Sequence, residues 1–367
     1  MITEKLLSER YRFKEDYVPY QLLQSQKDAR KLFLDNIHKK NEYVIIAECP
    51  YCNNNSCIKI SEIERRWLPS EIVICKSCDG CFKLNVMSLR ANEYHYGKIS
   101  YILRGKEISD DAVEAIFWKR VKSYAYPRFH FILHFIELKP KRDLVAEFGC
   151  NDGANLYPWH ERGFNALGIE LDNEMVEFGK RKGLNLIYGE LLNYNFSEKN
   201  PGLIILSHVL EHVRDCNSVL AKLHEVLKPD GYLFIEVPGI RSHGLRNPML
   251  YFDVEHNYYF DLNSLSKLLK RHAFKLIYAD EYVRVLCTPN QEKSIIKASK
   301  KVPLSFKRII AAVLKKFVDV LSFKREGLYD LLKKGEGNSF RIRILNKIQA
   351  MYFHYYYSYI CASNGKK

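Results

Sequence analysis

The sequence predicts an α/β fold, a parallel sheet covered by helices on both faces, preceded by a small metal-binding module. Two observations carry this prediction. From Asp143 onward short apolar runs alternate with amphipathic segments, and six cysteines lie between Cys49 and Cys81. Strands that alternate with helices at this spacing form parallel sheets, because each return crossover is a helix. Clustered cysteines favour a metal site over disulfides in a reducing compartment.

Length and composition limit the class of protein. The 367 residues exceed one ordinary core and suggest about two domains with appendages. No apolar run in the sequence reaches the roughly 18 residues that cross a bilayer. The first residues carry charges where a signal peptide needs an apolar stretch. We therefore expect a cytoplasmic protein.

The elements follow in order along the chain. Residues 1–42 have apolar positions at helical spacing and predict an N-terminal helical segment, and 43–95 hold the cysteine module. Residues 96–290 predict the main α/β domain, which opens with a helix over 110–138 that is broken or bent near Pro127. Its five parallel strands are predicted in LVAEFG, ALGIELD, LNLIYGE, GLIILSHV and GYLFIEVP, followed by a helix in SLSKLLKRHAF and two late strands in KLIYADEYVRVLCT.

Almost all of the net charge of +14 lies in the C-terminal region, residues 291–367. Residues 293–367 hold 17 Lys and Arg against 4 Asp and Glu, so the rest of the chain is nearly neutral. Apolar stripes between the basic residues predict helices there. Three interpretations stay open: a packing helix with a solvated basic face, peripheral association with the inner face of an anionic membrane, or contact with an anionic polymer, nucleic acid being the least favoured.

The cysteines form two C-x-x-C knuckles separated by 22 residues, a spacing close to that of a zinc ribbon. Four soft sulfurs arranged tetrahedrally suit a structural Zn²⁺. Cys81 makes an overlapping pair with Cys78, so the second knuckle can be shifted, whereas Cys57 is expected in a strand. The predicted ligands are Cys49, Cys52, Cys75 and Cys78.

Three acidic positions follow the ends of successive predicted strands. Glu147 opens a small-residue turn, Glu-Phe-Gly-Cys-Asn-Asp-Gly, that lets backbone approach a ligand before a helix begins. Asn151 stands where the dinucleotide pattern has its second glycine, so that pattern fits poorly. Glu170 ends the second strand, where a carboxylate can accept two hydrogen bonds from a ribose diol. Glu190 follows the third strand, where its side chain or adjacent backbone can meet an adenine amino group.

The segment Ser207-His-Val-Leu-Glu-His-Val and the later LKPDGYLFIEVPG complete a recognisable set. Together with the first turn and Glu170 they resemble the class I S-adenosylmethionine-dependent methyltransferases over about residues 125–285. The Asn-Asp-Gly form of the turn resembles the sugar C-methyltransferase branch, which carries an N-terminal zinc module. The resemblance implies a Rossmann-like, seven-stranded sheet and S-adenosyl-L-methionine as cofactor. The residues expected to bind it are Glu147, Gly149, Asn151, Asp152, Gly153, Glu170, Leu171, Glu190, Leu191, Ser207 and His208.

A segment after the fifth strand carries the candidate catalytic residues. Glu255-His256, followed by Tyr258-Tyr-Phe, resembles the E-H-x-x-Y-F segment of the sugar C-methyltransferases, where the Glu/His pair is associated with proton removal next to a ketone. Histidine accepts a proton near neutral pH, and a neighbouring carboxylate can orient it. We expect His256 as the base and Glu255 as its partner or an alternative base. Tyr251 and Tyr258 are expected to bind or polarise the substrate oxygen, and His243 and Arg246 are further candidates for an anionic substrate group.

The function expected from these features is methylation of a sugar or glycoconjugate precursor, on carbon or oxygen, in surface-polysaccharide or natural-product biosynthesis. Two alternatives stay open. One is a methyltransferase acting on nucleic acid or protein, in which the zinc module and the basic region bind the substrate. The other is a non-catalytic scaffold with a degenerate cofactor site.

Overall fold

The computed structural model describes residues 2–18, 22–103, 110–196, 200–241, 251–280 and 282–290. They divide into two compact units. Unit 1 takes in the described residues of Met1–Glu107 and Gly239–Ser264, and unit 2 those of Ile108–Pro238 and Leu265–Ile296. The basic region predicted over 291–367 lies outside the described residues, as do His243 and Arg246. No helix in the described part of the chain is long and apolar enough to cross a membrane.

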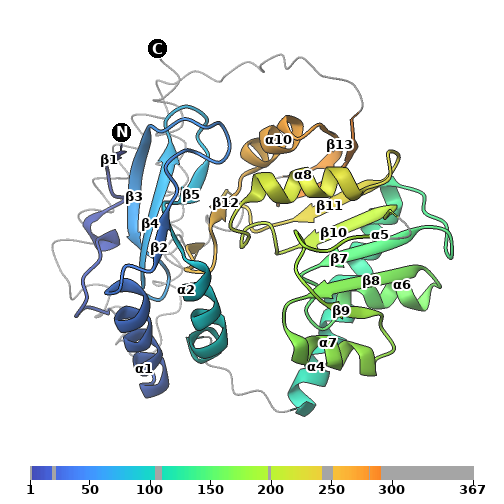
Figure 1. The fold of residues 1–367 in the computed structure, drawn as a ribbon, viewed down its shortest axis with the longest axis horizontal. Coiled ribbons are helices and arrows are strands. Elements are labelled where there is room, and N and C mark those ends of the chain that lie inside the picture. Colours follow the sequence, from blue (N-terminus) through green and yellow to red (C-terminus); the bar gives the residue numbers. More distant parts are fainter. Residues whose placement is uncertain are drawn as a thin grey trace, which may run out of the picture. The chain divides into compact units, whose positions relative to one another are not determined.

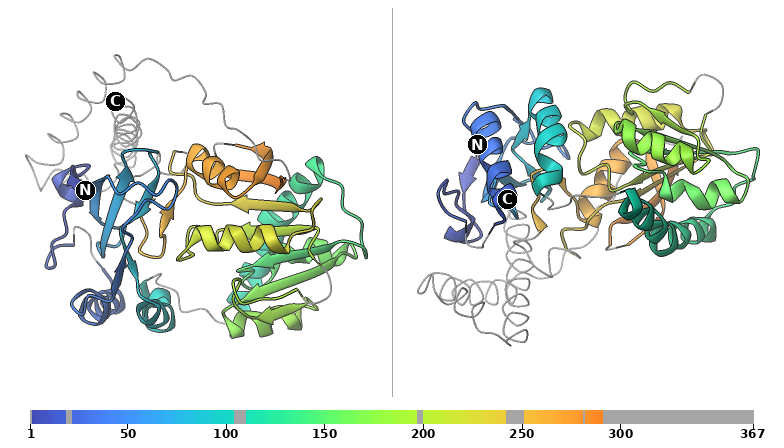
Figure 2. Two further views of the ribbon diagram at one scale, coloured as in Figure 1. Left: turned by 45° about the horizontal axis from the view of Figure 1, so that its top comes forward. Right: turned by 90° about the horizontal axis from the view of Figure 1, so that it is seen from below.

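Unit 2 contains the predicted seven-stranded sheet, in the order β13-β14-β11-β10-β7-β8-β9 (Figure 1). All neighbouring pairs from β11 to β9 are parallel, whereas β14 runs antiparallel to both β11 and β13. Figure 2 (left) shows the green strands β7–β9 toward one edge and the orange β13–β14 hairpin toward the other. The strands are β7 (Leu144–Phe148), β8 (Asn165–Glu170), β9 (Leu186–Tyr188), β10 (Leu203–Ser207), β11 (Tyr232–Glu236), β13 (Phe274–Ala279) and β14 (Arg284–Pro289).

Both faces of this sheet are buried, as the near-continuous apolar strands predict. Side chains alternate between faces, and Val145, Leu203 and Phe234 pack in one core with helices α4 to α7. The intervening Ala146 and Ile204 point to the opposite face and are equally buried. The predicted two-faced α/β fold is therefore confirmed. The helices are α4 (Asp110–Arg120), η4 (Val121–Ala125), α5 (Tyr126–Phe135), η5 (Ala154–Leu156), α6 (Tyr157–Glu161), α7 (Asn173–Arg181), α8 (Cys216–Val226) and α10 (Leu262–Arg271).

Local sequence explains where several of these helices begin. The side chain of Asp172 accepts hydrogen bonds from the backbone N–H groups of the first turn of α7, and Asp215 does the same for α8. A π-helical stretch, η4, separates α4 from α5, and Pro127 lies in the first turn of α5; the break or bend near Pro127 stays a prediction.

The strand order positions the site. From β7 the chain adds β8 and β9 on one side and then returns to add β10 and β11 on the other. In such sheets, ligands bind outside the carboxyl ends of the strands where the order reverses. The carboxyl ends of β7 and β10 are therefore the expected place for a ligand.

Unit 1 contains a five-stranded sheet, β1-β3-β4-β5-β12, and a two-stranded sheet, β2-β6. β1 is parallel to β3, and the other pairs are antiparallel. The strands are β1 (Ile2–Glu4), β2 (Tyr43–Ile45), β3 (Cys57–Ile63), β4 (Pro69–Cys75), β5 (Cys81–Lys83), β6 (Asn85–Met87) and β12 (Tyr258–Tyr259); the helices are η1 (Glu9–Tyr11), α1 (Gln24–Phe33), η2 (Leu34–His38), α2 (Leu89–Tyr94), η3 (His95–Ile99) and α3 (Ser100–Leu103).

Unit 1 is larger than the predicted zinc module of residues 43–95. The segment 1–42, predicted to be helical, contains α1 but begins with strand β1, which extends the sheet. Residues of Gly239–Ser264, which the sequence assigned to the main domain, belong to unit 1 because β12 pairs with β5. The candidate catalytic segment is thus built on the cysteine module.

Candidate functional site

The turn after β7 requires residues that adopt left-handed backbone conformations. Gly149, Asn151 and Gly153 have φ angles of 63°, 52° and 77°. Asparagine tolerates this region better than most residues, so Asn151 does not prevent a tight turn. At Gly149 a Cβ atom would lie 2.7 Å from Cγ2 of Val209. Glycine is therefore required at Gly149 by both conformation and space.

Glu147 lies at the carboxyl end of β7 and is only 1% exposed. Its Oε1 accepts a 2.7 Å hydrogen bond from Nδ2 of Asn155. Its Oε2 is buried and has no hydrogen-bond partner among the described residues. Burial raises the pKa of Glu147 to about 8. A buried acceptor atom without a partner at this position is suited to a cationic ligand group.

Glu170, at the end of β8, organises the turn next to it. Its carboxylate accepts hydrogen bonds from the backbone N–H groups of Asn151 at 2.8 Å, Leu171 at 2.7 Å and Asp172 at 3.1 Å. The side chain of Leu171 is 61% exposed. Oε1 accepts two of these bonds and Oε2 accepts one, so Oε2 keeps a lone pair for a further donor. The carboxylate can therefore hold the turn and still accept a hydrogen bond from a hydroxyl group of a ligand.

The remaining predicted cofactor residues lie at the same edge of the sheet or just beyond it. Asp152 is buried, and its carboxylate lies 3.3 Å from Nη1 of Arg120. Glu190 and Leu191 follow β9; Glu190 is exposed and accepts a 2.6 Å hydrogen bond from Asn193. No contact in the described part of the chain fixes a ligand role for Glu190 or Leu191, so their part in cofactor binding stays a prediction.

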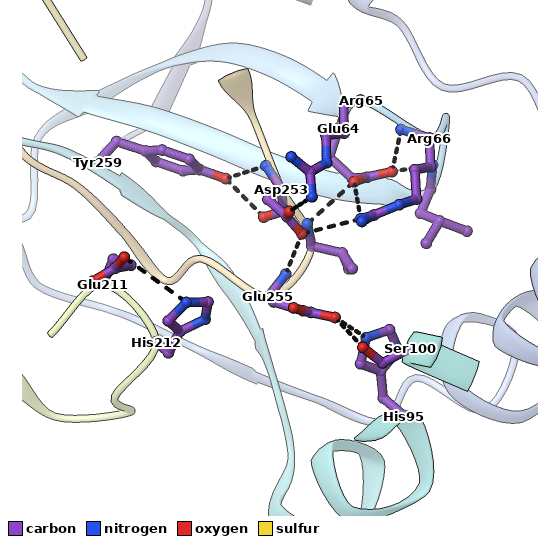
Figure 3. Close-up of polar contacts among 12 residues, drawn as sticks. Glu64, Arg65, Arg66, His95, Ser100, Glu211, His212, Asp253, Glu255 and Tyr259 are labelled. Atoms are coloured by element: carbon purple, nitrogen blue, oxygen red, sulfur yellow. Dashed lines mark hydrogen bonds and ion pairs between the residues drawn. The ribbon is translucent and has the colours of Figure 1, made fainter. Parts of the chain in front are cut away.

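Ser207 ends β10, and His208 follows it directly. His208 has a left-handed backbone, with φ of 56°, and its N–H donates to the carbonyl of Glu236 at 2.8 Å. Its Nδ1 lies 3.4 Å from Oε1 of the buried Glu211, and Nε2 of His212 lies 3.9 Å from the same oxygen. Burial would lower the pKa of His208, but the interaction of its ring with the carboxylate of Glu211 outweighs burial, and the pKa is raised. Figure 3 shows the Glu211–His212 pair.

The candidate catalytic segment is held in unit 1 by buried charges (Figure 3). Asp253 is 3% exposed and forms ion pairs with Arg65 and, at 3.2 Å, with Arg66. Glu64, 1% exposed, accepts hydrogen bonds from the backbone of Val254. These contacts fix the backbone of the segment on the side of β3 and β4.

Glu255 does not have the surroundings expected of a simple partner for His256. Its carboxylate accepts hydrogen bonds from Nε2 of His95 at 3.1 Å and from Oγ of Ser100 at 2.5 Å. Those residues come from η3 and α3. The positive charge of His256 instead contributes to lowering the pKa of Asp253, although burial alone would raise it. The structure therefore gives Glu255 an anchoring role, and its proposed part in proton removal stays a prediction.

The two candidate tyrosines pack in apolar surroundings. Tyr251 is 7% exposed and packs against Phe252 and Tyr259. Tyr258, 4% exposed, lies edge-on to Tyr51 with ring centroids 6.3 Å apart. Packing accounts for both rings without a substrate, and their predicted contact with a substrate oxygen stays untested.

The four predicted zinc ligands come together. The Sγ atoms of Cys49 and Cys78 lie 3.5 Å apart, as do those of Cys52 and Cys75, and all four lie within 4.8 Å of one another. Zn–S bonds of about 2.3 Å in a tetrahedron place sulfurs about 3.8 Å apart, close to this spacing. Cys81 is instead a buried residue of β5, and Cys57 begins β3, as expected.

The two knuckles have the same backbone form. Asn53 N–H donates to the carbonyl of Cys49 at 2.8 Å, and Asp79 N–H donates to that of Cys75 at 3.1 Å. Both donors are left-handed, with φ of 61° and 64°. This repetition explains why the sulfurs of each C-x-x-C pair point to one place, and it makes the cluster suited to a closed metal site.

Sequence reasoning missed several residues of the site. Arg128 and Asn155 join Glu147 to Glu236, and Asp253 lies two positions before the predicted Glu255. Asn155 lies in the first helical turn after Gly153, and a polar residue at that position is a sequence signal for a contact with the site. Nothing in the sequence pairs Arg128 with residues that follow it by 27 and 108 positions.

Comparison with known proteins identifies the α/β region. A family profile described as "Methyltransferase domain" matches residues 117–279. This region is a methyltransferase domain. It contains the turn that holds Glu147 and every strand of the seven-stranded sheet except β14, so the resemblance to S-adenosylmethionine-dependent methyltransferases is confirmed there.

Individual relatives are distant. The chain is 28% identical over 145 residues to the C-methyltransferase NovU of Streptomyces niveus, covering 37% of this chain and 33% of that protein. It is 26% identical over 114 residues to a ubiquinone biosynthesis O-methyltransferase of Pseudomonas aeruginosa, covering 29% and 47%. The chain thus matches a third to a half of these relatives' length. DesVI of Streptomyces venezuelae superposes with a TM-score of 0.41 at 12% identity, covering 50% of this chain and all of that one.

Proposed function

We propose that this protein transfers a methyl group from S-adenosylmethionine to a sugar or glycoconjugate precursor. The observation that carries the proposal is the buried Glu147, whose Oε2 has no hydrogen-bond partner in the described part of the chain, beside a glycine turn that Glu170 organises. S-adenosylmethionine supplies a methyl group on a positively charged sulfur and carries both an ammonium group and a ribose diol. Glu147 suits the ammonium group, and Glu170 suits the diol.

His256 is proposed as the base. Methyl transfer to carbon or oxygen requires removal of a proton from the acceptor, and a ring nitrogen of His256 accepts it. Asp253, whose carboxylate interacts with the charge of His256, stabilises the protonated ring. Glu255, bound by His95 and Ser100, fixes the backbone that carries His256.

A sugar acceptor and methylation on carbon are favoured by two observations. The Glu-His-x-x-Tyr-Phe segment resembles that of sugar C-methyltransferases, and one relative is named a C-methyltransferase. The O-methyltransferase relatives keep oxygen open as the methylated atom. The biosynthetic context proposed is a surface polysaccharide or a natural product, in the cytoplasm.

We further propose that Cys49, Cys52, Cys75 and Cys78 hold one structural Zn²⁺. A closed four-sulfur site leaves no position for water or substrate, so the metal stabilises unit 1. Since unit 1 carries the 251–261 segment, the metal supports catalysis by holding that backbone.

The experiment is transfer of labelled methyl groups from S-adenosylmethionine to a panel of nucleoside-diphosphate sugars, including keto sugars, with RNA and protein acceptors alongside. We expect transfer to a sugar, abolished in His256→Ala and retained in His38→Ala, a half-buried histidine of the same unit. With a keto sugar, exchange of the proton next to the ketone into heavy water, dependent on His256, identifies methylation on carbon. Transfer only to RNA or protein would contradict the proposal.

A further inference from the structure

Two acidic residues stand on either side of the end of β10. Glu147 belongs to β7 and Glu236 ends β11, and the sheet order β11-β10-β7 puts two strand spacings between them. Across the sheet that separation is roughly 10 Å, and Glu236 also lies two residues further along the strands, since Glu147 is in register with Ile205 and Glu236 with Ser207. A single small donor cannot reach both carboxylates, so a connection between them needs more than one side chain.

Arg128 and Asn155 make that connection. The Nε and Nη2 atoms of Arg128 each lie 2.7 Å from Oε2 of Glu236, and its Nη1 donates to Oδ1 of Asn155. The Nδ2 of Asn155 donates to Oε1 of Glu147 at 2.7 Å. The side chain of Arg128 is only 10% exposed, so these contacts lie out of bulk solvent.

The chemistry of the two groups fixes the direction of every bond. Arginine has donors and no acceptor, so the oxygen of the Asn155 amide must face Arg128. The amide NH₂ must then face Glu147. One oxygen of Glu147 is thereby engaged, and Oε2, which has no partner among the described residues, is held in one orientation.

We propose that Glu236, Arg128 and Asn155 form a positioning relay that presents Oε2 of Glu147 to the ammonium group of the cofactor's methionine part. This inference rests on the proposed function. Arg128 and Asn155 are positioning residues, because they act through Glu147. A buried carboxylate binds a cation best when it is ionised and fixed, and the relay supplies the fixing donor.

Binding should therefore depend on pH. The pKa of Glu147 is about 8, raised by burial and by the charges of Asp152 and Glu170, and lowered by Asn155 and Arg128. The buried thiol of Cys150 also faces it. A ligand with an ammonium group binds the ionised carboxylate of Glu147. Its affinity therefore rises with pH until Glu147 is already ionised in the ligand-free protein. From pH 6 to pH 8 we expect at least about tenfold tighter binding, since each unit of pKa shift is tenfold in affinity.

The test compares two ligands by calorimetry at pH 6, 7 and 8. S-adenosylhomocysteine carries the ammonium group, whereas methylthioadenosine lacks the whole amino-acid part. We expect the affinity for the first to rise with pH and that for the second to stay constant. Asn155→Asp keeps the size of the side chain but replaces the donor by an acceptor facing Glu147. This substitution should weaken the affinity for S-adenosylhomocysteine at pH 7 by about tenfold or more. The affinity for methylthioadenosine should stay within about threefold of the wild-type value.

Lys228→Gln is the matched control, because it breaks a half-buried ion pair, with Asp143 at 2.9 Å, at the amino end of β7. It should keep both affinities. Equal, pH-independent binding of S-adenosylhomocysteine by wild type and Asn155→Asp would overturn the relay and leave the proposed function standing. A wild-type protein that binds neither ligand would overturn both.

Discussion

Asp253→Asn tests whether buried charges hold the candidate catalytic segment, residues 251–261, on unit 1. The carboxylate is 3% exposed and is paired with Arg65 and Arg66, and it accepts the backbone N–H of Glu255 at 3.1 Å. Breaking a buried ion pair leaves a charge without its partner and costs about 3–5 kcal/mol. We expect a loss of this size in the local stability of unit 1, equal to roughly a 100-fold or larger fall in hydrogen-exchange protection.

The assay is hydrogen exchange of the full, zinc-loaded chain, followed by mass spectrometry of its peptides. Peptides of β3 and β4 should lose protection in Asp253→Asn, and those of β7 and β10 should keep it. Glu4→Gln is the control, since Glu4 forms an exposed ion pair with Arg12 in the same unit. Exposed pairs contribute about 1 kcal/mol or less. Unchanged protection of β3 and β4 in Asp253→Asn would refute the reasoning.

The pH dependence of this effect has a definite sign. Burial acts to raise the pKa of Asp253, but the charges of His256, Arg66 and Arg65 lower it below its usual 3.8. A carboxyl group whose pKa is lower in the folded state than in the unfolded state stabilises the fold at pH values above its unfolded pKa. This stabilisation is lost as the pH falls through the folded pKa. In urea titrations the difference between wild type and Asp253→Asn should therefore persist at pH 5 and shrink below about pH 4.

Three further predictions concern the metal, the turn and the base. Purified protein should contain about one zinc per chain by plasma emission; Cys78→Ser should lose it and Cys81→Ala retain it, and a metal-free but fully folded unit 1 would contradict the assignment. Gly149→Ala forces an alanine to φ of 63° and puts its Cβ 2.7 Å from Val209. The affinity for S-adenosylhomocysteine should therefore fall by about tenfold or more. Gly163→Ala, left-handed but with open space around its Cβ, should lower stability alone. His256→Ala should lower kcat by about 100-fold or more with cofactor affinity kept, and loss of both would make His256 structural.

The sequence predicts the sheet of unit 2 well because its signals are local. Apolar runs, the turn around Gly149 and caps such as Asp172 each specify their own element, and all agree with one fold. The cysteine cluster is predictable for the same reason, since two identical knuckles need only a metal to join them. Cys81 is excluded as a ligand by its place in β5, which requires knowledge of the strand register.

The partners of the candidate catalytic segment could not be predicted, because they are set by tertiary contacts. Glu255 meets His95 and Ser100, which precede it by 160 and 155 positions. Adjacency in sequence suggested His256 as its partner, but a turn can direct neighbouring side chains to different places. The assignment of this segment to unit 1 rests on two residues of β12 pairing with β5, too short a strand for any pattern to reveal.

The central claim is that the turn after β7 and the end of β8 bind S-adenosylmethionine. Calorimetric titration of wild type, Glu170→Ala and Glu174→Ala with S-adenosylmethionine and S-adenosylhomocysteine tests it most directly, because Glu174 is an exposed carboxylate just beyond the site. We predict micromolar binding, about −8 kcal/mol, that weakens at least about tenfold in Glu170→Ala and is unchanged in Glu174→Ala. Absence of binding to the folded, zinc-loaded protein would contradict the claim and leave a scaffold with the fold of a methyltransferase.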